Sequence, residues 1–237
     1  MGHDCTNNLL DALRPEDRAL LEPLLRRVEL PADSLLFHPG DVIEQCYFPC
    51  GNSIASFHVV MDDGRPIETA MVGREGALGG IVSHGRLPAF ARACVLRGGG
   101  FLKLSLADLA RIKDQRPSVE RLFNRYADCF IAQIFQGVAC NAAHTIEQRA
   151  ARWLCAAVER AGTNTVTMTQ DQLGGLLGVG RSYASRVLQR FRVESLVTTH
   201  RGAIEVRDEP ALRHTACNCN NLIRAHFDEV LSGVYPE

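Results

Sequence analysis

The sequence predicts an α+β fold, in which an N-terminal antiparallel β-roll is followed by one long helix and then by a C-terminal domain of helices with a small hairpin. Three observations support this order. Short β-branched and aromatic segments alternate with turn residues from Val28 to about Val95. After Pro117, apolar residues recur at helical spacing over roughly seven turns. Two helix-capping patterns, at Thr145 and Thr169, then mark the C-terminal domain.

The composition is that of a globular protein. The 237 residues are 46% hydrophobic, which is enough to bury a core in one large or two modest domains. The net charge is -1, so any nucleic-acid surface must be local. No apolar run approaches the roughly 18 residues of a membrane span. Because the nine cysteines are scattered and the N-terminus lacks an export segment, we expect a cytoplasmic protein with reduced thiols and no membrane contact.

The first domain is expected to cover residues 1–115. Its apolar residues between positions 7 and 27 have helical spacing, and Pro15 is well placed to open a second short helix. From Val28 onward, turn signals such as Pro39-Gly40-Asp41 separate many short strands. This pattern predicts a compact roll or barrel.

A single helix is expected over residues 116–144. Its apolar residues cover more than one stripe, which is wider than packing against a single partner requires. These residues are Val119, Leu122, Phe123, Tyr126, Phe130, Ile131, Ile134, Phe135 and Val138. We therefore predict that one face of the helix meets the roll and another meets a second copy of the chain, forming a homodimer.

The C-terminal domain, residues 145–237, contains a stretch close to a nucleotide-binding loop. The sequence GGLLGVGRS at 174–182 differs from G-x-x-x-x-G-K-[ST] by Arg181 in the lysine position. A phosphate loop needs a strand before it, whereas this stretch follows a helix capped by Thr169. The chain also offers no nucleophile and base at a recognisable spacing. We therefore predict that the protein is not an enzyme.

The same stretch is explained by two helices joined by a tight turn at Gly178. In the second helix, the apolar residues that fall on one face are Ala184, Val187, Leu188 and Phe191. The polar residues that fall on the opposite face are Ser182, Ser185, Arg186 and Gln189, with Arg181 in the first turn. Arginine can pair with guanine and glutamine with adenine, so this face is suited to reading the major groove of DNA.

A hairpin is expected after this helix, with Arg201 at its tip. The segment 181–207 holds six arginines against Glu194 and Glu205, a local positive surplus in a nearly neutral chain. A helix-turn-helix followed by such a wing places one helix in the major groove and lets the wing contact phosphates. Double-stranded DNA is therefore the predicted partner.

With these segments the chain resembles the CRP/FNR superfamily of bacterial transcription regulators over nearly its whole length. The resemblance is carried by TMTQDQLGGLLGVGRSYASRVLQRF, by CNAAHTIEQRAARWL, by FPCGNSIASFHVVMDDGRPIETAMVGREGALGG and by ACNCNNLIRAHFDEVL. It implies a homodimer with a cyclic-nucleotide-binding-like sensor roll, a dimerisation helix and a winged DNA-binding domain. It also implies an inverted-repeat operator and contacts with RNA polymerase.

By position in the family motif, Arg181, Ser182, Ser185 and Arg186 are implied to contact bases and phosphates. Thr169, Gln189 and Arg201 complete the candidate DNA-binding set. Many family members carry glutamate where this chain has Ser182, so the family's usual operator does not follow.

The sensor half departs from the family pattern. Nucleotide-binding members hold the cyclic phosphate with a Gly-Glu pair and an Arg-Ser pair, but here Val72-Gly73-Arg74-Glu75-Gly76 is shifted and Pro88-Ala89 falls where Arg-Ser is expected. Ile134 and Phe135 lie about where polar residues would contact a purine. We expect no cyclic nucleotide, and an unidentified small-molecule effector. The candidate effector pocket is Arg74, Glu75, Arg86 and Arg92.

Metal and haem cofactors are also not expected. The oxygen-sensing branch of the family gathers cysteines for an iron-sulfur cluster near its N-terminus, where this chain has only Cys5. We expect Cys217 and Cys219 to lie on a terminal helix and to point to different sides of it, which disfavours a shared metal. The histidines considered for haem are His38, His58 and His84, each more typical of a structural or surface residue.

One alternative from a different functional class remains. The chain could be a ligand-binding or protein-interaction module whose winged domain no longer reads DNA. The arginines of the predicted recognition face argue against it.

Overall fold

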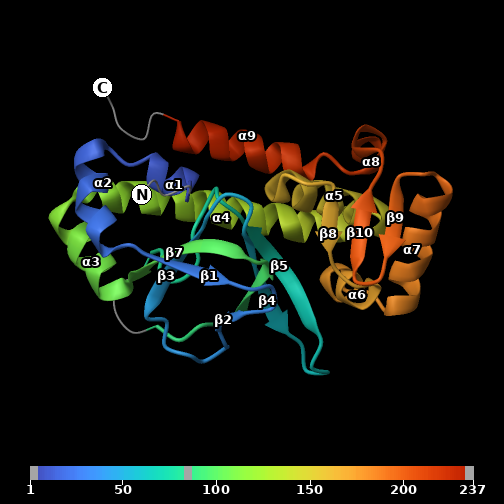
Figure 1. The fold of residues 1–237 in the computed structure, drawn as a ribbon, viewed down its shortest axis with the longest axis horizontal. Coiled ribbons are helices and arrows are strands. Elements are labelled where there is room, and N and C mark those ends of the chain that lie inside the picture. Colours follow the sequence, from blue (N-terminus) through green and yellow to red (C-terminus); the bar gives the residue numbers. More distant parts are fainter. Residues whose placement is uncertain (1–4, 83–86, 233–237) are drawn as a thin grey trace.

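The computed structural model describes residues 5–82 and 87–232 and has the predicted α+β architecture. Figure 1 shows the roll at one end of the long axis and the C-terminal helical domain at the other, with the long helix α4 running beside the roll. None of the helices in the described ranges is both long and apolar enough to cross a bilayer.

The N-terminal helices attach to the roll through a buried side chain. Asn7 accepts a hydrogen bond from the backbone of Leu10 and so caps α1 (Asn8–Asp11). Its amide donates to the carbonyls of Pro49 and Gly76, both at 2.9 Å. Helix α2 (Pro15–Leu21) begins at Pro15 as predicted, and a 3₁₀ turn follows at Glu22–Leu24. The expectation of helix as far as residue 27 is wrong, because Arg26 already pairs with Lys103 in a sheet.

Two antiparallel sheets form the roll, as the turn-punctuated sequence predicts. One has the order β1-β7-β3 and the other the order β2-β6-β4-β5. The strands are β1 (Arg26–Leu30), β2 (Leu35–Phe37), β3 (Gln45–Pro49), β4 (Ile54–Val60), β5 (Pro66–Val72), β6 (Arg92–Arg97) and β7 (Gly99–Ser105). Apolar side chains such as Phe37, Val95 and Phe101 fill the space between the sheets.

The long helix α4 (Pro117–Ala143) has the predicted position and length. A preceding helix, α3 (Leu106–Gln115), was not predicted, and its N-cap is Ser105. Apolar side chains of the first half of α4, such as Leu122 and Phe123, are buried. In its second half, three apolar side chains are exposed: Ile131 (47%), Phe135 (69%) and Val138 (65%). We call these three residues the apolar stripe.

The C-terminal domain contains both predicted capping boxes, at Thr145 and Thr169. Its elements are α5 (Ile146–Ala161), β8 (Thr165–Thr167), α6 (Gln170–Leu177), α7 (Arg181–Val193), β9 (Val197–His200), β10 (Ala203–Val206), α8 (Glu209–Thr215) and α9 (Cys219–Leu231). The predicted hairpin, β9 and β10, gains β8 as a third strand in the order β8-β10-β9. The core of this domain also contains Ile54 and Met71 of the roll, so the two domains share one packed interior.

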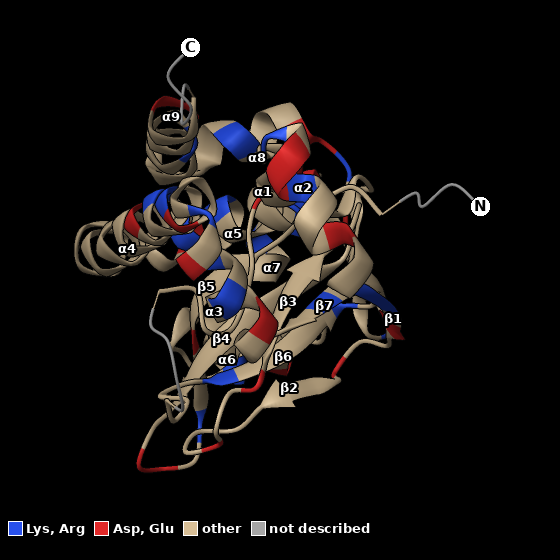
Figure 2. Ribbon diagram, turned by 90° about the vertical axis from the view of Figure 1, so that its left-hand side faces the viewer, with Lys and Arg blue, Asp and Glu red and all other residues tan. Residues whose placement is uncertain are grey.

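The last helix, α9, runs back along α4 toward the roll. Figures 1 and 2 both show the two helices side by side. The rings of Tyr126 and Phe227 lie 6.3 Å apart, and the Arg125 guanidinium donates to the carbonyl of Val230 at 2.8 Å. These contacts attach the C-terminal helix to the long helix.

The cysteines differ in one respect from the expectation of reduced thiols. Cys5 and Cys50 form a disulfide, with their Cα atoms 4.8 Å apart. The other cysteines are free and buried.

Candidate nucleic-acid interface

Helices α6 and α7 are joined by a turn that requires glycine. Gly178 ends α6 with φ of +69°, a conformation that side chains other than glycine rarely adopt. A Cβ on Gly174 would lie 2.9 Å from the carbonyl oxygen of Val179, so glycine also permits α6 to approach the turn. Because a helix precedes these glycines, the segment is a helix-turn-helix and not a phosphate-binding loop.

The two faces of α7 separate as predicted. Ala184, Val187, Leu188 and Phe191 are buried against the domain core. On the opposite face, Arg181, Ser182, Arg186 and Gln189 are exposed, and Ser185 is half-buried. Packing thus fixes the helix while its polar face is presented to solvent.

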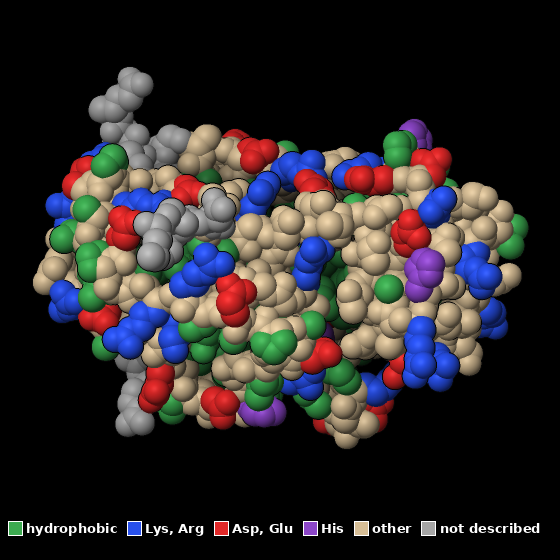
Figure 3. Space-filling model, in the orientation of Figure 1, with side chains coloured by type: hydrophobic (Ala, Val, Ile, Leu, Met, Phe, Trp, Pro, Cys, Tyr) green, Lys and Arg blue, Asp and Glu red, His purple; other side chains and the backbone are tan. Residues whose placement is uncertain are grey.

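The charged groups on this face lack carboxylate partners. Within residues 5–82 and 87–232, Arg181, Arg186 and Arg201 form no ion pair. The Arg186 guanidinium instead lies over the ring of Tyr183, 5.0 Å from its centroid. By contrast, other arginines of the domain are paired, such as Arg190 with Glu194 at 3.0 Å. Figure 3 shows basic side chains over the end of the molecule where Figure 1 places α7 and the hairpin.

The wing lies beside the start of α6. Arg201 and Gly202 form its two-residue turn, and Gly202 has φ of +76°. A groove of about 370 Å³ lies between the hairpin and α6, and both Thr169 and Arg181 line it. The Thr169 hydroxyl accepts a hydrogen bond from the backbone of Gln172 at 3.1 Å, which leaves its own proton free for another acceptor.

Residues 148–215 match the model of the Crp-like helix-turn-helix domain. This part of the chain is therefore a Crp-like helix-turn-helix domain. It is 25% identical over 229 residues to the transcriptional regulatory protein btr of Bordetella pertussis, covering 90% of this chain and 89% of btr.

Two solved structures have the same fold as this chain. FixK2 from Bradyrhizobium japonicum has a TM-score of 0.68 and 15% identity, with 81% of this chain and 98% of FixK2 covered. A CRP-family transcriptional regulator from Thermus thermophilus has a TM-score of 0.68 and 16% identity, with 81% of this chain and 96% of that regulator covered. The relatives are transcription regulators and not enzymes, in agreement with the prediction from sequence.

Two of the candidate effector residues, Arg74 and Glu75, line one cavity, and Arg92 is not part of its lining. Glu75 is paired with Arg160 of α5 at 2.7 Å. Burial alone would raise the pKa of Glu75, but the charge and hydrogen bond of Arg160 outweigh it and hold that pKa below its usual value. Arg74 is exposed beside it. Arg92 lies on β6 with its Nε buried and without a hydrogen-bond partner, and Arg86 lies outside the described residues.

A cavity of about 700 Å³ lies between the roll, α4 and the winged domain, and both Arg74 and Glu75 line it. Glu68 of β5 also lines it and accepts a hydrogen bond from the Trp153 indole at 2.7 Å. Burial raises the pKa of Glu68 to about 7, with the Trp153 hydrogen bond and the charge of Arg152 opposing the rise. The cavity wall therefore contains direct polar contacts between the roll and the winged domain.

The histidines considered for haem have other surroundings. His58 is buried on β4, where burial, aided by the charge of Arg92, lowers its pKa to about 4. Its Nδ1 lies 3.5 Å from the Cys94 sulfur. His38 is exposed, and His84 lies outside the described residues.

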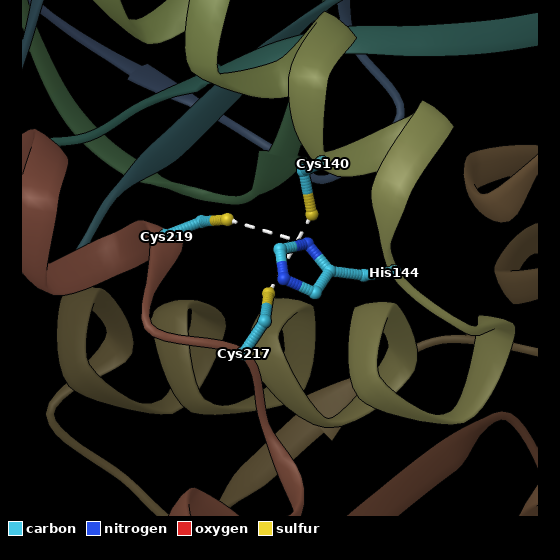
Figure 4. A group of neighbouring side chains, drawn as sticks. All are labelled: Cys140, His144, Cys217 and Cys219. Carbon is cyan, nitrogen blue, oxygen red and sulfur yellow. Dashed lines mark hydrogen bonds between the residues drawn. The ribbon is translucent and has the colours of Figure 1, made fainter.

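The structure brings together a group of side chains that the sequence analysis missed. The donor atoms of Cys140, His144, Cys217 and Cys219 all lie within 4.8 Å of one another (Figure 4). The expectation that Cys217 and Cys219 share one helix is wrong, because Cys217 lies in the link before α9 and only Cys219 belongs to it. The available signal was the spacing of Cys140 and His144, four residues apart at the end of α4.

Proposed function

We propose that the protein is a sequence-specific DNA-binding transcription regulator that acts as a homodimer on an inverted repeat. The observation that carries the proposal is the polar face of α7, which is held by a buried apolar face and whose residues Arg181 and Arg186 have no carboxylate partners among the described residues. Unpaired arginines on a rigid helix are suited to bind bases and phosphates.

The position of each candidate residue determines whether it would contact bases or phosphates. Arg186 and Gln189 lie along the exposed face of α7 and would reach base edges, together with Ser182 and Ser185. Arg181 at the start of the helix, Arg201 at the wing tip and Thr169 in the groove between them would contact phosphates. Phosphate contacts orient the protein, whereas base contacts select the sequence.

The apolar stripe on α4 supports the homodimer. Ile131, Phe135 and Val138 repeat at helical spacing and remain exposed in the single chain. The same stripe of a second copy, related by a two-fold axis, would cover them. Two recognition helices would then read half-sites about one helical turn apart.

The signal would act through the roll and through the cavity between the domains. A ligand can change DNA affinity only if it binds two arrangements of the domains with different affinities. Because Glu75 is committed to Arg160, we assign no cyclic nucleotide to the roll, and the effector is proposed as a small molecule of another kind. As a bacterial-type regulator, the protein would work in the cytoplasm and contact RNA polymerase.

Selection from a random pool of DNA duplexes tests the proposal. We expect the purified protein to enrich an inverted repeat, and Arg186→Ala to lose enrichment at defined positions of each half-site. Arg213→Ala is a matched control, because Arg213 is on α8 of the same domain and is already paired with Glu159 and Glu209. If no sequence were enriched, the interaction-module function would replace the proposal.

Light scattering tests the dimer. We expect twice the chain mass for the wild type and a monomer for Phe135→Asp, since a carboxylate in the apolar stripe would be buried without a partner. Phe90→Asp serves as control because Phe90 is 84% exposed but lies on the roll. A monomeric wild type would contradict the dimer.

A further inference from the structure

Three cysteines and one histidine converge from two regions that are far apart in the sequence. Cys140 lies in the last turn of α4, and His144 is the residue at which that helix ends. Cys217 and Cys219 come from the link between α8 and α9 and from the first residue of α9. Figure 4 shows the three sulfur atoms directed toward the imidazole. All three cysteines are buried, and His144 is half-buried.

Two of the distances between the donor atoms are close to the edges of a tetrahedron around one metal ion, and all of them are within 4.8 Å. Two sulfurs bound to zinc at about 2.3 Å lie about 3.8 Å apart, and a bound sulfur and nitrogen lie about 3.6 Å apart. The sulfurs of Cys140 and Cys217 are 3.5 Å apart. The Cys219 sulfur is 3.7 Å from His144 Nδ1. An iron-sulfur cluster would place several atoms between the ligands and hold them farther apart, so the spacing favours a single ion.

A hydrogen-bond donor and two guanidinium groups lie near the sulfur atoms. The Gln136 side chain donates a hydrogen bond to the Cys219 sulfur at 3.1 Å. Arg152 is close enough to Cys140 to interact with its charge, and Arg149 interacts in this way with both Cys140 and Cys217. Three thiolates and one divalent ion carry a net charge of about -1, which these nearby guanidinium groups offset.

We propose that Cys140, His144, Cys217 and Cys219 form a structural Zn²⁺ site that fixes the C-terminal end of the long helix to the start of α9. Four protein ligands of the types sulfur and nitrogen form a closed tetrahedral site, which is the arrangement of structural rather than catalytic zinc. No fourth position is left open for water or substrate.

The site has a defined mechanical consequence. His144 ends α4, and the next residue, Thr145, caps α5, the first helix of the winged domain. A metal bound to His144, to the α8–α9 link and to the start of α9 would therefore hold the junction between the long helix and the winged domain. If the proposed DNA-binding function is correct, the ion also fixes the orientation of the recognition helix.

Elemental analysis of the purified full-length chain, with a parallel cobalt titration, tests the site. We expect about one zinc per chain. Loss of a residue that only orients a metal ligand weakens metal binding by roughly 10–100-fold. Cys217→Ser and His144→Ala each remove a ligand itself, so we expect them to weaken zinc binding by more than this. Cys129→Ser is the matched control, because Cys129 is a free, buried cysteine of the same helix α4 outside the group, and it should retain zinc.

The cobalt titration starts from metal-free protein, so its result does not depend on zinc acquired during purification. Chelator-stripped protein should bind Co²⁺ with the intense visible bands of tetrahedral thiolate ligation, and His144→Ala should change those bands. Circular dichroism of each variant establishes that it is folded, and His144→Ala, which alters a half-buried side chain, is the variant expected to fold best.

Three results would overturn the proposal. The first is an equal metal content in the wild type and in a folded His144→Ala variant. The second is iron with inorganic sulfide in place of zinc. The third is a disulfide between Cys140 and Cys217 in the metal-free protein, if the protein does not bind cobalt after this disulfide has been reduced. None of these measurements uses DNA, so the metal site and the DNA-binding function can fail separately.

Discussion

The winged domain and the roll use their charged side chains in opposite ways. On α7 and the wing, Arg181, Arg186 and Arg201 are left without ion-pair partners among the described residues. In and around the roll, two acidic side chains are instead paired within the protein itself. Glu75 pairs with Arg160 at 2.7 Å, and the buried Asp17 accepts from Arg116 at 2.6 Å. A surface that binds an external polyanion must keep its cations free, whereas groups that hold domains together must be paired.

The two regions nevertheless share a boundary. Glu68 and Glu75 of the roll contact Trp153 and Arg160 of α5 across it. A change at the roll can therefore reach the winged domain through these contacts. The following predictions test how far the two regions are independent.

The largest effect is expected in the core of the winged domain. Phe191 is fully buried in the interior that also includes Met71 of the roll. Phe191→Ala should lower the free energy of unfolding by about 3–5 kcal/mol. Denaturant titration measures it, with Phe90→Ala as control. Phe90 is 84% exposed and its loss should change stability by less than about 0.5 kcal/mol. Equal losses in the two variants would contradict the assigned core.

The next effect concerns the ion pair across the boundary. Arg160→Ala leaves the Glu75 carboxylate without its partner, and we expect a loss of about 2 kcal/mol. This is less than for a fully buried pair, because the two side chains retain 23% and 25% exposure. The double variant Glu75→Gln/Arg160→Ala should recover part of the loss because the unpaired charge is gone. A double variant less stable than the single one would show that the pair acts by packing alone.

A pH dependence is expected from Glu68. Its pKa is raised from 4.5 to about 7 on folding, so the folded state binds this proton more tightly than the unfolded chain. The stabilisation is therefore complete below about pH 4.5 and is lost as the pH rises through about 7. We expect a change on the order of 1 kcal/mol, because water reaches part of the boundary. Unfolding measured across this range should show the change in wild type and not in Glu68→Gln; identical profiles would exclude it.

The smallest change in stability is expected for two helix caps, of which one stabilises its helix only and the other is also proposed to bind DNA. Thr145 and Thr169 form equivalent capping boxes on α5 and α6. Replacing either with alanine should cost about 1 kcal/mol of stability or less. Only Thr169→Ala should also weaken DNA binding, because only Thr169 lies in the groove with Arg181. Equal DNA affinities of the two folded variants would remove Thr169 from the interface.

The sequence predicted the winged domain better than the roll, because the sequence patterns that indicate the winged domain each span only a few neighbouring residues. The capping boxes at Thr145 and Thr169, the turn at Gly178 and the polar face of α7 are each written within a few residues. Helix α3 and strand β8 were not predicted. Strand β8 (Thr165–Thr167) is only three residues long and depends on pairing with β10.

Contacts between distant residues could not be predicted from local patterns. Glu75 and Arg160 are 85 residues apart in the sequence, and Cys140 and Cys217 are 77 apart. The second pair meets because α9 folds back on α4 and carries the preceding link to the end of that helix. The partner of Glu75 in α5 could not be predicted for the same reason.

DNA binding by the polar face of α7 is tested most directly by fluorescence anisotropy on the selected duplex and on a scrambled one, across a salt series. The proposal predicts preferential binding of the selected duplex, weakening steeply with salt by a slope of about 0.9 for each phosphate contact. Arg186→Ala should lose about 1–3 kcal/mol of binding free energy on the selected duplex, while Arg213→Ala binds as the wild type does. Equal, salt-insensitive binding of both duplexes, or an Arg186→Ala that binds like the wild type, would contradict it.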